Sequence, residues 1–216
     1  MNEVAPPELE AEPPQAIALF GDRIKLARSF TQSLAAQGET LGLIGPRELP
    51  HLWSRHILNS AMLAPLLRGR VGDVGSGAGL PGLVLAIARP DVHLTLIEPM
   101  ERRTAWLQAE VDRMGLDNVA VLRARAEELP GSGALLPLDQ VTARAVSALR
   151  TLLPLTAPLA RSGGELLLLK GARAGEEIAA AQKAIRKHRL QDVEVLELGA
   201  EHGLEVTRVV RAVVDP

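Results

Sequence analysis

The 216-residue chain contains no cysteine and no tyrosine, and aromatic residues make up only 2% of it. The absence of cysteine excludes disulfides, thiolate zinc sites and cysteine nucleophiles, and it fits a reducing cytoplasm, where we expect the protein to reside. The shortage of aromatic residues predicts an aliphatic core. It also argues against a nucleic-acid site built on stacking platforms of Tyr or Phe.

The sequence also lacks an excess of charge and a long apolar run. Its 24 Lys and Arg residues stand against 26 Asp and Glu residues, so a nucleic-acid partner would have to meet a local basic face. The most apolar stretch, residues 151–170, is interrupted by two prolines, Arg161 and a glycine pair, and the first residues are acidic and proline-rich. We therefore expect neither a membrane span nor a signal peptide.

Hydrophobic periodicity divides the chain into three parts. Residues 1–14 carry four Glu, four Pro and no basic residue, which predicts a disordered tail. Residues 15–68 are expected to be a helical extension packed on the core, with helices over 15–37 and 49–67. From residue 69 to 216, short apolar strands alternate with helices, which predicts the ligand-binding domain.

The order of the predicted elements in this last part indicates the fold. Strands are expected at residues 70–75, 92–98, 118–124, 138–144, 164–170, 192–198 and 205–214, and helices at 80–88, 101–115, 148–160 and 175–188. This alternation implies an α/β, Rossmann-like fold with a mostly parallel, doubly wound sheet and helices on both faces. The last two strands are expected to form an antiparallel C-terminal hairpin.

The stretch DVGSGAGLPG, residues 73–82, follows the first predicted strand and has four glycines in ten positions. Such a loop permits a tight turn and brings backbone N–H groups close to a ligand at the start of the next helix. Residues 77–82 also fit the GxGxxG pattern of a dinucleotide site. An NAD-dependent oxidoreductase is therefore one alternative, although it would need a substrate domain, which we do not expect after the terminal hairpin.

Acidic residues near this loop favour S-adenosylmethionine over a dinucleotide. Asp73, just before the first glycine, suits a cationic amino-acid group and would repel a pyrophosphate. Glu98 closes the second strand, where it can bind both ribose hydroxyls, a role that an NAD enzyme would share. Ala126 and Glu127 follow the third strand, where they can border an adenine.

Six segments together resemble a known family. They are LWSRHILNS at 52–60, DVGSGAGLPG at 73–82, RTAWL at 103–107, ARAEE at 124–128, ARAVSAL at 143–149 and LLLLKG at 166–171. They are similar to those of the bacterial small-subunit ribosomal RNA guanine-N7 methyltransferases, the glucose-inhibited division protein B family. The resemblance runs from residue 16 to the C-terminus. It implies a class I methyltransferase fold, S-adenosylmethionine as the methyl donor, and 16S ribosomal RNA or the small ribosomal subunit as the substrate.

The resemblance also implies a set of site residues. With Asp73 added from the argument above, the expected cofactor-binding residues are Asp73, Gly75, Gly77, Leu80, Glu98, Ala126, Glu127 and Arg144. Arg144, facing the substrate pocket, and Lys170, reaching toward RNA, are the candidate catalytic residues. The resemblance implies Arg55, His56 and Lys170 as RNA-binding residues. Arg123 and Arg173 lie near predicted strand ends, where a basic rim can form, and they complete the expected RNA-binding set. Three features depart from the family pattern, namely Asn59 in place of Asp, Ala78 in place of Pro, and the stretch ETLGLI at 39–44.

The residues present suit methylation at guanine N7. That atom carries a free lone pair and needs no deprotonation, so the reaction requires mainly the placement of two reactants. We expect no metal site, because His51 and His56 are five positions apart, off the i,i+4 spacing of helical zinc ligands. Arg102, Arg103, Arg150 and the basic residues of 183–189 are interpreted as solvated helix positions.

Two further functions remain as alternatives at this point. One is a small-molecule methyltransferase, in which the N-terminal helices cap a closed pocket. The other is a cofactor-binding RNA assembly factor without turnover. We expect the protein to be a monomer.

Overall fold

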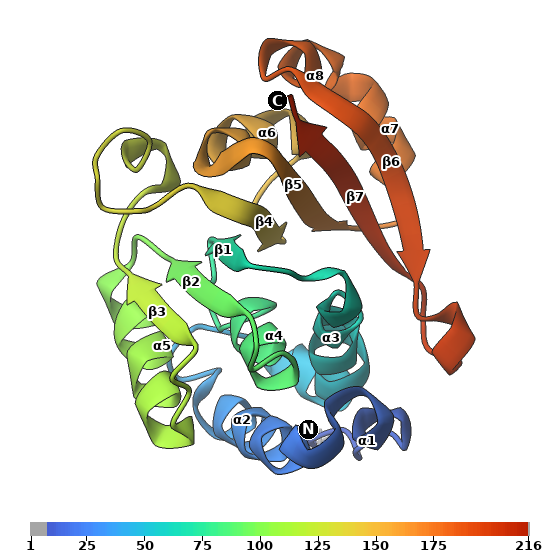
Figure 1. Cartoon of the computed structure of the whole chain (residues 1–216). Coiled ribbons are helices and arrows are strands. Elements are labelled where there is room, and N and C mark those ends of the chain that lie inside the picture. The colour runs from blue at the N-terminus through green and yellow to red at the C-terminus, as the bar shows by residue number, and fades with distance from the viewer. Residues whose placement is uncertain (1–7, 216) are drawn as a thin grey trace, which may run out of the picture.

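A seven-stranded sheet forms the centre of the molecule (Figure 1). The computed structural model describes residues 8–215, and its strands follow the order β3-β2-β1-β4-β5-β7-β6. The strands are β1 Arg70–Val74, β2 His93–Ile97, β3 Val119–Leu122, β4 Leu138–Arg144, β5 Ala160–Lys170, β6 Leu190–Leu198 and β7 Thr207–Val214. Strands β1 to β5 pair in parallel, whereas β7 lies antiparallel to both β5 and β6. The predicted parallel sheet with a C-terminal hairpin is confirmed.

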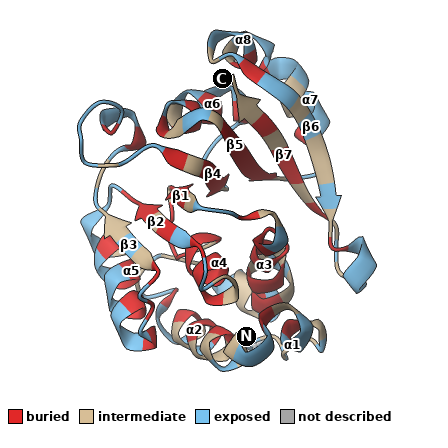
Figure 2. Ribbon diagram, in the orientation of Figure 1, coloured by how far each residue is buried: buried red, intermediate tan, exposed pale blue. Residues whose placement is uncertain are grey.

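Helices cover both faces of this sheet. They are α1 Gln15–Phe20, α2 Ile24–Gln37, α3 Asn59–Ala61, α4 Gly82–Ala88, α5 Glu101–Met114, α6 Leu149–Thr156, α7 Ala174–Ala180 and α8 Gln182–Lys187. Helices α1 to α5 share one core cluster, which includes Phe30 and Leu83, and α6 to α8 share a second, which includes Leu153 and Ile185. Figure 2 shows buried residues along the central strands and on the inward sides of the helices.

The leucine run of β5 shows why the sheet has a core on each face. Successive side chains of a strand point to opposite faces. Leu167 and Leu169 accordingly belong to the first cluster, and Leu166 and Leu168 to the second. A strand that is covered on both sides needs a continuous apolar run rather than an alternating one.

The first predicted helix is divided at Gly21. Helix α1 ends at Phe20, and Gly21 has a φ angle of 49°, which glycine adopts readily and other residues avoid. A single 3-10 turn, Gly21–Arg23, then leads into α2. In the same way, the helix predicted over 175–188 is interrupted at Ala181 and forms α7 and α8.

Residues 8–14 are ordered, in contrast to the predicted disorder. The Glu10 backbone N–H donates to the Leu49 carbonyl at 3.0 Å, and the Glu10 carboxylate accepts from the Ser54 backbone N–H at 2.9 Å. Glu12 forms a bidentate pair with Arg28, with one contact of 2.7 Å. These carboxylates bind the chain to the helices that follow, so the prediction is wrong for this segment. Residues 1–7 of the predicted tail lie outside the described residues.

The second predicted helix, over 49–67, is not one regular α-helix. It comprises a 3-10 helix at Pro46–His51, a π-helix at Leu52–Leu58, the short α3, and a 3-10 turn at Ala64–Leu66. Pro50 lacks a backbone N–H and cannot continue an α-helical hydrogen-bond ladder. This irregular segment packs on α2 and α4.

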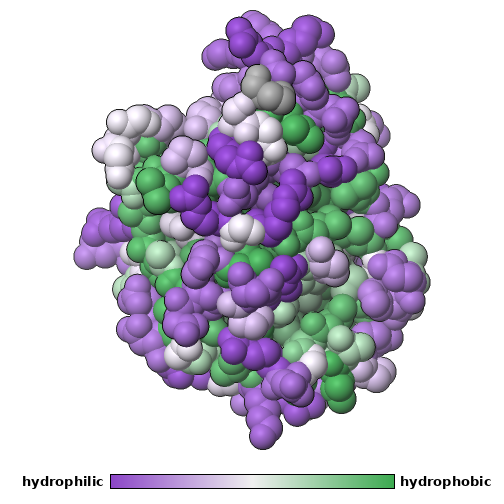
Figure 3. All heavy atoms as spheres, in the orientation of Figure 1, coloured by the Kyte–Doolittle hydropathy of each residue, from purple (hydrophilic) through white to green (hydrophobic). Residues whose placement is uncertain are grey.

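The helical extension and the sheet domain share one core, because Phe30 and Leu34 belong to the same cluster as Leu83 and Leu107. The boundary between residues 68 and 69 therefore stays a prediction. Figure 3 shows hydrophilic and apolar side chains interspersed over one face of the molecule, with hydrophilic residues gathered near α8. Within residues 8–215, no helix combines the length and apolar character that crossing a bilayer requires.

Candidate active site

The glycine loop between β1 and α4 adopts backbone conformations that most residues avoid. Gly75, Gly77 and Gly79 have φ angles of 71°, 52° and 94°, where a Cβ atom would be strained. The loop is also held from outside, because the indole N–H of Trp106 in α5 donates to the Ala78 carbonyl at 3.1 Å. It is therefore a preformed turn at the carboxyl edge of the sheet, where doubly wound folds bind ligands.

Asp73 lies fully buried beneath this loop. Its Oδ2 accepts a hydrogen bond from the Gly82 backbone N–H at 3.0 Å, at the start of α4. Its Oδ1 is buried and has no hydrogen-bond partner among the described residues. Burial raises the pKa of Asp73 to about 7. An unpartnered buried carboxylate oxygen fits a cationic group, such as the ammonium of S-adenosylmethionine.

The raised pKa of Asp73 predicts a pH-dependent contribution to stability. Between its ordinary pKa of 3.8 and about 7, the folded state holds a proton that the unfolded chain has lost. The free energy of unfolding should therefore decrease through this group as pH rises from about 4 to about 7, by roughly 3–4 kcal/mol. Asp73→Asn cannot titrate and should lack this slope, as urea unfolding at pH 5 and pH 7.5 would measure. An identical slope in both proteins would contradict the assignment.

Glu98 is almost completely buried at the end of β2. Its Oε2 accepts from the Gly77 backbone N–H at 3.0 Å, and its Oε1 accepts from the Met100 backbone N–H at 2.9 Å. The guanidinium of Arg103 lies 3.9 Å from Oε2. Each carboxylate oxygen keeps a second lone pair, so the residue fits the predicted pair of ribose hydroxyls while it also holds the glycine loop.

Ala126 and Glu127 begin a 3-10 turn, Ala126–Glu128, that follows β3. The Glu98 backbone N–H donates to the Leu122 carbonyl at 3.1 Å, so the end of β3 lies beside the end of β2. Ala126 is buried and Glu127 is exposed, an arrangement that suits the border of an adenine. Leu80 is half-buried and packs against the core below the glycine loop. The cofactor contacts of all three residues stay predictions.

Arg144, the last residue of β4, joins the sheet edge to the irregular segment 46–66. Its Nη2 donates to the Arg55 carbonyl at 2.8 Å and contacts His56 Nδ1 at 3.0 Å. Its Nη1 donates to the His56 carbonyl at 3.3 Å and to the Ser60 hydroxyl at 3.2 Å. Burial lowers the pKa of Arg144 to about 10, which leaves it charged at neutral pH. The guanidinium is thus held in one position.

Lys170, at the end of β5, is the second candidate catalytic residue. Its Nζ donates to the Ser147 carbonyl at 2.6 Å and to Glu177 Oε2 at 2.8 Å. The side chain is only 8% exposed. The Glu177 carboxylate also accepts from the Leu149 backbone N–H at the start of α6. In this structure the ammonium therefore joins β5, α6 and α7, and its predicted contact with RNA would require these bonds to be exchanged.

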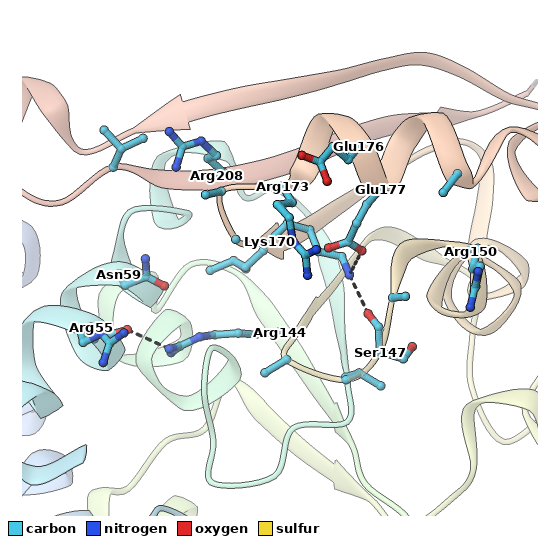
Figure 4. A pocket seen from close by; sticks show the side chains of 18 of the residues that line it. Arg55, Asn59, Arg144, Ser147, Arg150, Lys170, Arg173, Glu176, Glu177 and Arg208 are labelled. Atoms are coloured by element: carbon cyan, nitrogen blue, oxygen red, sulfur yellow. Dashed lines mark hydrogen bonds and ion pairs between the residues drawn. The ribbon is translucent and has the colours of Figure 1, made fainter. Parts of the chain in front are cut away.

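A cavity of about 980 Å³ opens at the carboxyl ends of β4 and β5, beside β7 (Figure 4). The charged residues that line it are Arg55, Arg144, Arg150, Lys170, Arg173, Arg208, Glu176, Glu177 and Glu205. Six cations against three acids make this a local basic site on a chain with a net charge of −2. Val146 lies between the cavity and the glycine loop, since a Cβ on Gly75 would be 2.8 Å from Val146 Cγ2. The two sites are contiguous.

The structure brings only part of the predicted RNA-binding set together. Arg55, Lys170 and Arg173 line the cavity, and His56 lies beside it through Arg144. Arg123 lies elsewhere, after β3, where it pairs with Glu101 at 3.0 Å. Arg150, interpreted from the sequence as solvated, and Arg208, which the sequence reasoning missed, both line the cavity. No local sequence pattern marks Arg208, because its place beside Lys170 comes from the antiparallel pairing of β7 with β5.

The residues at this sheet edge do not form a metal site. Within residues 8–215 no group of three or more His, Asp or Glu side chains is arranged to hold a metal ion. Asn59, one of the departures from the family pattern, donates to the Thr207 hydroxyl at 2.6 Å and lines the cavity. It connects the helical extension to β7.

Comparison with known proteins identifies the family. A family model described as rRNA small subunit methyltransferase G matches residues 23–206. The chain belongs to this family. A ribosomal RNA small subunit methyltransferase G from Clavibacter sepedonicus is 62% identical over 205 residues, covering 94% of this chain and 96% of that protein. One from Leifsonia xyli subsp. xyli is 64% identical over 207 residues, covering 95% and 98%. The family predicted from the six sequence segments is confirmed.

Solved structures place this methyltransferase G family member in a known fold. A SAM-dependent O-methyltransferase from Thermotoga maritima aligns with a TM-score of 0.54 at 16% identity, covering 74% of this chain and 65% of that one. A ribosomal protein L11 methylase from Lactobacillus delbrueckii subsp. bulgaricus aligns with a TM-score of 0.55 at 10% identity, covering 75% and 79%. At such identities the likeness concerns the fold alone, and it confirms the predicted class I methyltransferase fold.

Proposed function

We propose that the chain transfers a methyl group from S-adenosylmethionine to N7 of a guanine in the 16S RNA of the small ribosomal subunit. The observation that carries this proposal is the contact between a donor site and an acceptor site. The glycine loop, with Asp73 and Glu98, adjoins the basic cavity through Val146. The names of the relatives, rRNA small subunit methyltransferase G, support the substrate. We further propose that the protein acts as a monomer in the cytoplasm.

The chemistry at guanine N7 places modest demands on the protein. When bound, S-adenosylmethionine supplies an electrophilic methyl group on a sulfonium sulfur. The N7 lone pair needs no deprotonation, so no side chain has to act as a general base, and the rate depends on alignment of the two reactants. Glu98 and Asp73 hold the ribose and ammonium ends of the donor, and Arg144 forms a fixed wall of the adjoining cavity. Glycine at 75 and 77 permits the close approach of the backbone.

Three arginines at the cavity are free to bind phosphate. Lys170 pairs with Glu177, Arg208 pairs with Glu197, and Arg144 is held by the segment 55–60. By contrast, the side chains of Arg55, Arg150 and Arg173 are exposed and form no ion pair or hydrogen bond within residues 8–215. They come from the π-helix, from α6 and from the residue before α7. Three unpaired guanidinium groups around one cavity suit an RNA backbone.

The structure predicts how these three arginines contribute to RNA affinity. Arg55→Ala, Arg150→Ala and Arg173→Ala should each lower the slope of log affinity against log salt concentration by about 0.7, the value for one phosphate on single-stranded nucleic acid. Filter binding of 16S RNA at several salt concentrations measures the slope. Arg186→Ala on α8 removes another exposed arginine, one outside the cavity, and should leave the slope unchanged. Equal slopes in all four variants would contradict the phosphate contacts. Arg123→Ala tests the RNA contact that the sequence predicts for Arg123, which lies away from the cavity.

The cavity argues against one alternative function and does not distinguish the other from the proposed one. A small-molecule methyltransferase would be expected to have an apolar, aromatic-lined pocket without a basic rim, whereas no aromatic residue lines this one. All four aromatic rings of the chain, Phe20, Phe30, Trp53 and Trp106, are buried. A target base would therefore pack against aliphatic side chains or guanidinium planes. An assembly factor without turnover would bind cofactor and RNA but transfer no methyl group.

The proposal is tested directly with purified protein and labelled S-adenosylmethionine. The substrates are small subunits and naked 16S RNA from cells that lack the modification, followed by chemical cleavage at N7-methylguanosine and primer extension. We expect one new stop at a guanine that depends on the protein. Binding of both ligands without label transfer to either substrate would favour the assembly factor.

A further inference from the structure

Two side chains of the helical extension form a hydrogen-bonded chain that ends on Arg144. Glu48, in the 3-10 helix Pro46–His51, lies 2.6 Å from His56 through its Oε2 and the imidazole Nε2. The other ring nitrogen of His56, Nδ1, lies 3.0 Å from Nη2 of Arg144. His56 is half-buried, with 16% of its side chain exposed. Neither residue is part of the sheet edge that carries the glycine loop.

The guanidinium of Arg144 determines where the hydrogen lies in this series of hydrogen bonds. A guanidinium nitrogen can only donate, so Nδ1 of His56 must accept and cannot carry a hydrogen. The hydrogen of the neutral imidazole is then on Nε2, from which it is donated to Glu48. The direction of both hydrogen bonds is therefore determined, and the imidazole has a single suitable tautomer.

Arg144 depends on these partners because it has no direct counter-ion. Among the described residues no carboxylate forms an ion pair with it, and its other acceptors are two backbone carbonyls and the Ser60 hydroxyl. The negative charge of Glu48 partly offsets the effect of burial on the Arg144 guanidinium. The imidazole thus links a half-buried cation to an acid whose charge supports it.

We propose that Glu48 and His56 are positioning residues, which hold the guanidinium of Arg144 in place at the wall of the basic cavity. His56 acts by accepting from Arg144, and Glu48 acts by fixing the tautomer of His56. The helical extension then positions a residue of the site in addition to packing on the sheet. For its activity readout, this inference rests on the proposed function.

Protonation of His56 should break the chain, because a hydrogen on Nδ1 would face a guanidinium N–H. The charged groups that act on the ring are Glu48 from the 3-10 helix, Arg55 from the π-helix and Arg144 from β4. His51, in the same 3-10 helix, acts on Glu48. Burial and the Arg144 charge lower the pKa of His56, and Glu48 raises it. Activity should therefore fall at acid pH with an inflection below the ordinary histidine value, and Glu48→Gln should move that inflection to still lower pH.

Steady-state kinetics at saturating donor and RNA distinguish positioning from a merely structural role. His56→Phe removes the acceptor and should lower kcat roughly tenfold or more, with the KM for either substrate changed less than kcat. His56→Asn places an amide oxygen near the position of Nδ1 and should restore most of kcat without the acid inflection. His51→Ala, an exposed histidine of the same turn, should behave as the wild type. Equal losses in His56→Phe and His56→Asn, or none in either, would overturn the proposal.

A spectroscopic measurement keeps the inference testable apart from activity. Nitrogen-15 NMR of the His56 ring in the unaltered protein at pH 7.5 should show the neutral tautomer with hydrogen on Nε2. The other tautomer, or a charged ring at this pH, would overturn the proposal. If the unaltered protein transfers no methyl group to ribosomal RNA, the proposed function fails while this measurement still decides the inference.

Discussion

Glu98→Ala is expected to lower the affinity for S-adenosylmethionine by about a hundredfold or more. The substitution removes the predicted acceptor of both ribose hydroxyls, and hydrogen bonds to a charged group contribute roughly 1.5–3 kcal/mol each. It also leaves the Gly77 and Met100 backbone N–H groups without the acceptor that they have now. The loop that approaches the ligand would therefore lose a contact as well. Isothermal titration calorimetry measures the effect directly.

Two comparisons separate this effect from a general loss of charge. Glu101→Ala removes an exposed acid three positions away, with 76% of its side chain in solvent, and should leave the affinity nearly unchanged. Glu98→Gln keeps the shape of the side chain but turns an acceptor into an N–H donor. Its affinity for S-adenosylmethionine should therefore lie between those of Glu98→Ala and Glu101→Ala. An unchanged affinity in Glu98→Ala would remove Glu98 from the cofactor site.

Gly82→Ala is expected to lower the free energy of unfolding by about 2–3 kcal/mol. A Cβ at this position would lie 2.5 Å from Asp73 Oδ2 and would also meet Leu96 Cδ2. Both neighbours are buried, so the start of α4 would have to move away from β1. For a domain of this size the expected fall in Tm is roughly 5–10 °C. Donor affinity should fall with it, because α4 begins where the glycine loop ends.

Gly175→Ala provides the matched control for this substitution. Gly175 is in the first turn of α7, and a Cβ there meets no atom within 4 Å. Alanine is favoured over glycine in a helix by up to about 1 kcal/mol, so this variant should be as stable as the wild type or more stable. Equal Tm values for the two variants would show that the start of α4 tolerates a side chain, and would contradict the close packing of Gly82 against Asp73.

The regular elements were predictable because their signals are local. The limits of β4, Leu138–Arg144, agree with the predicted strand, and α5 ends one residue before the predicted boundary, where Gly115 adopts a left-handed conformation. A run such as Leu166–Leu169 has to be buried on both faces, and a glycine after an amphipathic pattern ends a helix. The order of these elements was sufficient to predict the sheet.

The features that were not predicted depend on contacts between distant parts of the chain. The ordered residues 8–14 depend on carboxylates that meet Ser54 and Arg28, which nothing in the local composition indicates. The hydrogen bonds of the π-helix at Leu52–Leu58 each span one residue more than those of an α-helix, a difference that hydrophobic spacing does not resolve.

The candidate site divides in the same way. Its glycines and acids lie at or just after the ends of predicted strands, so the sequence pattern was sufficient to propose them as site residues. The pairing of Lys170 with Glu177 and the contacts of Arg144 with segment 55–60 require the tertiary fold. So does the separation of Arg123 from the cavity, because the end of β3 lies at the opposite side of the sheet from β7.

Ribosomal RNA from cells that lack this protein tests the proposed methyl transfer in its natural setting. Primer extension after chemical cleavage at N7-methylguanosine locates the modified guanine of the small-subunit RNA. We predict that its stop is absent from these cells, returns when the unaltered gene is supplied, and stays absent with the Glu98→Ala variant. Persistence of every N7-methylguanosine stop in cells without the protein would contradict the proposed function.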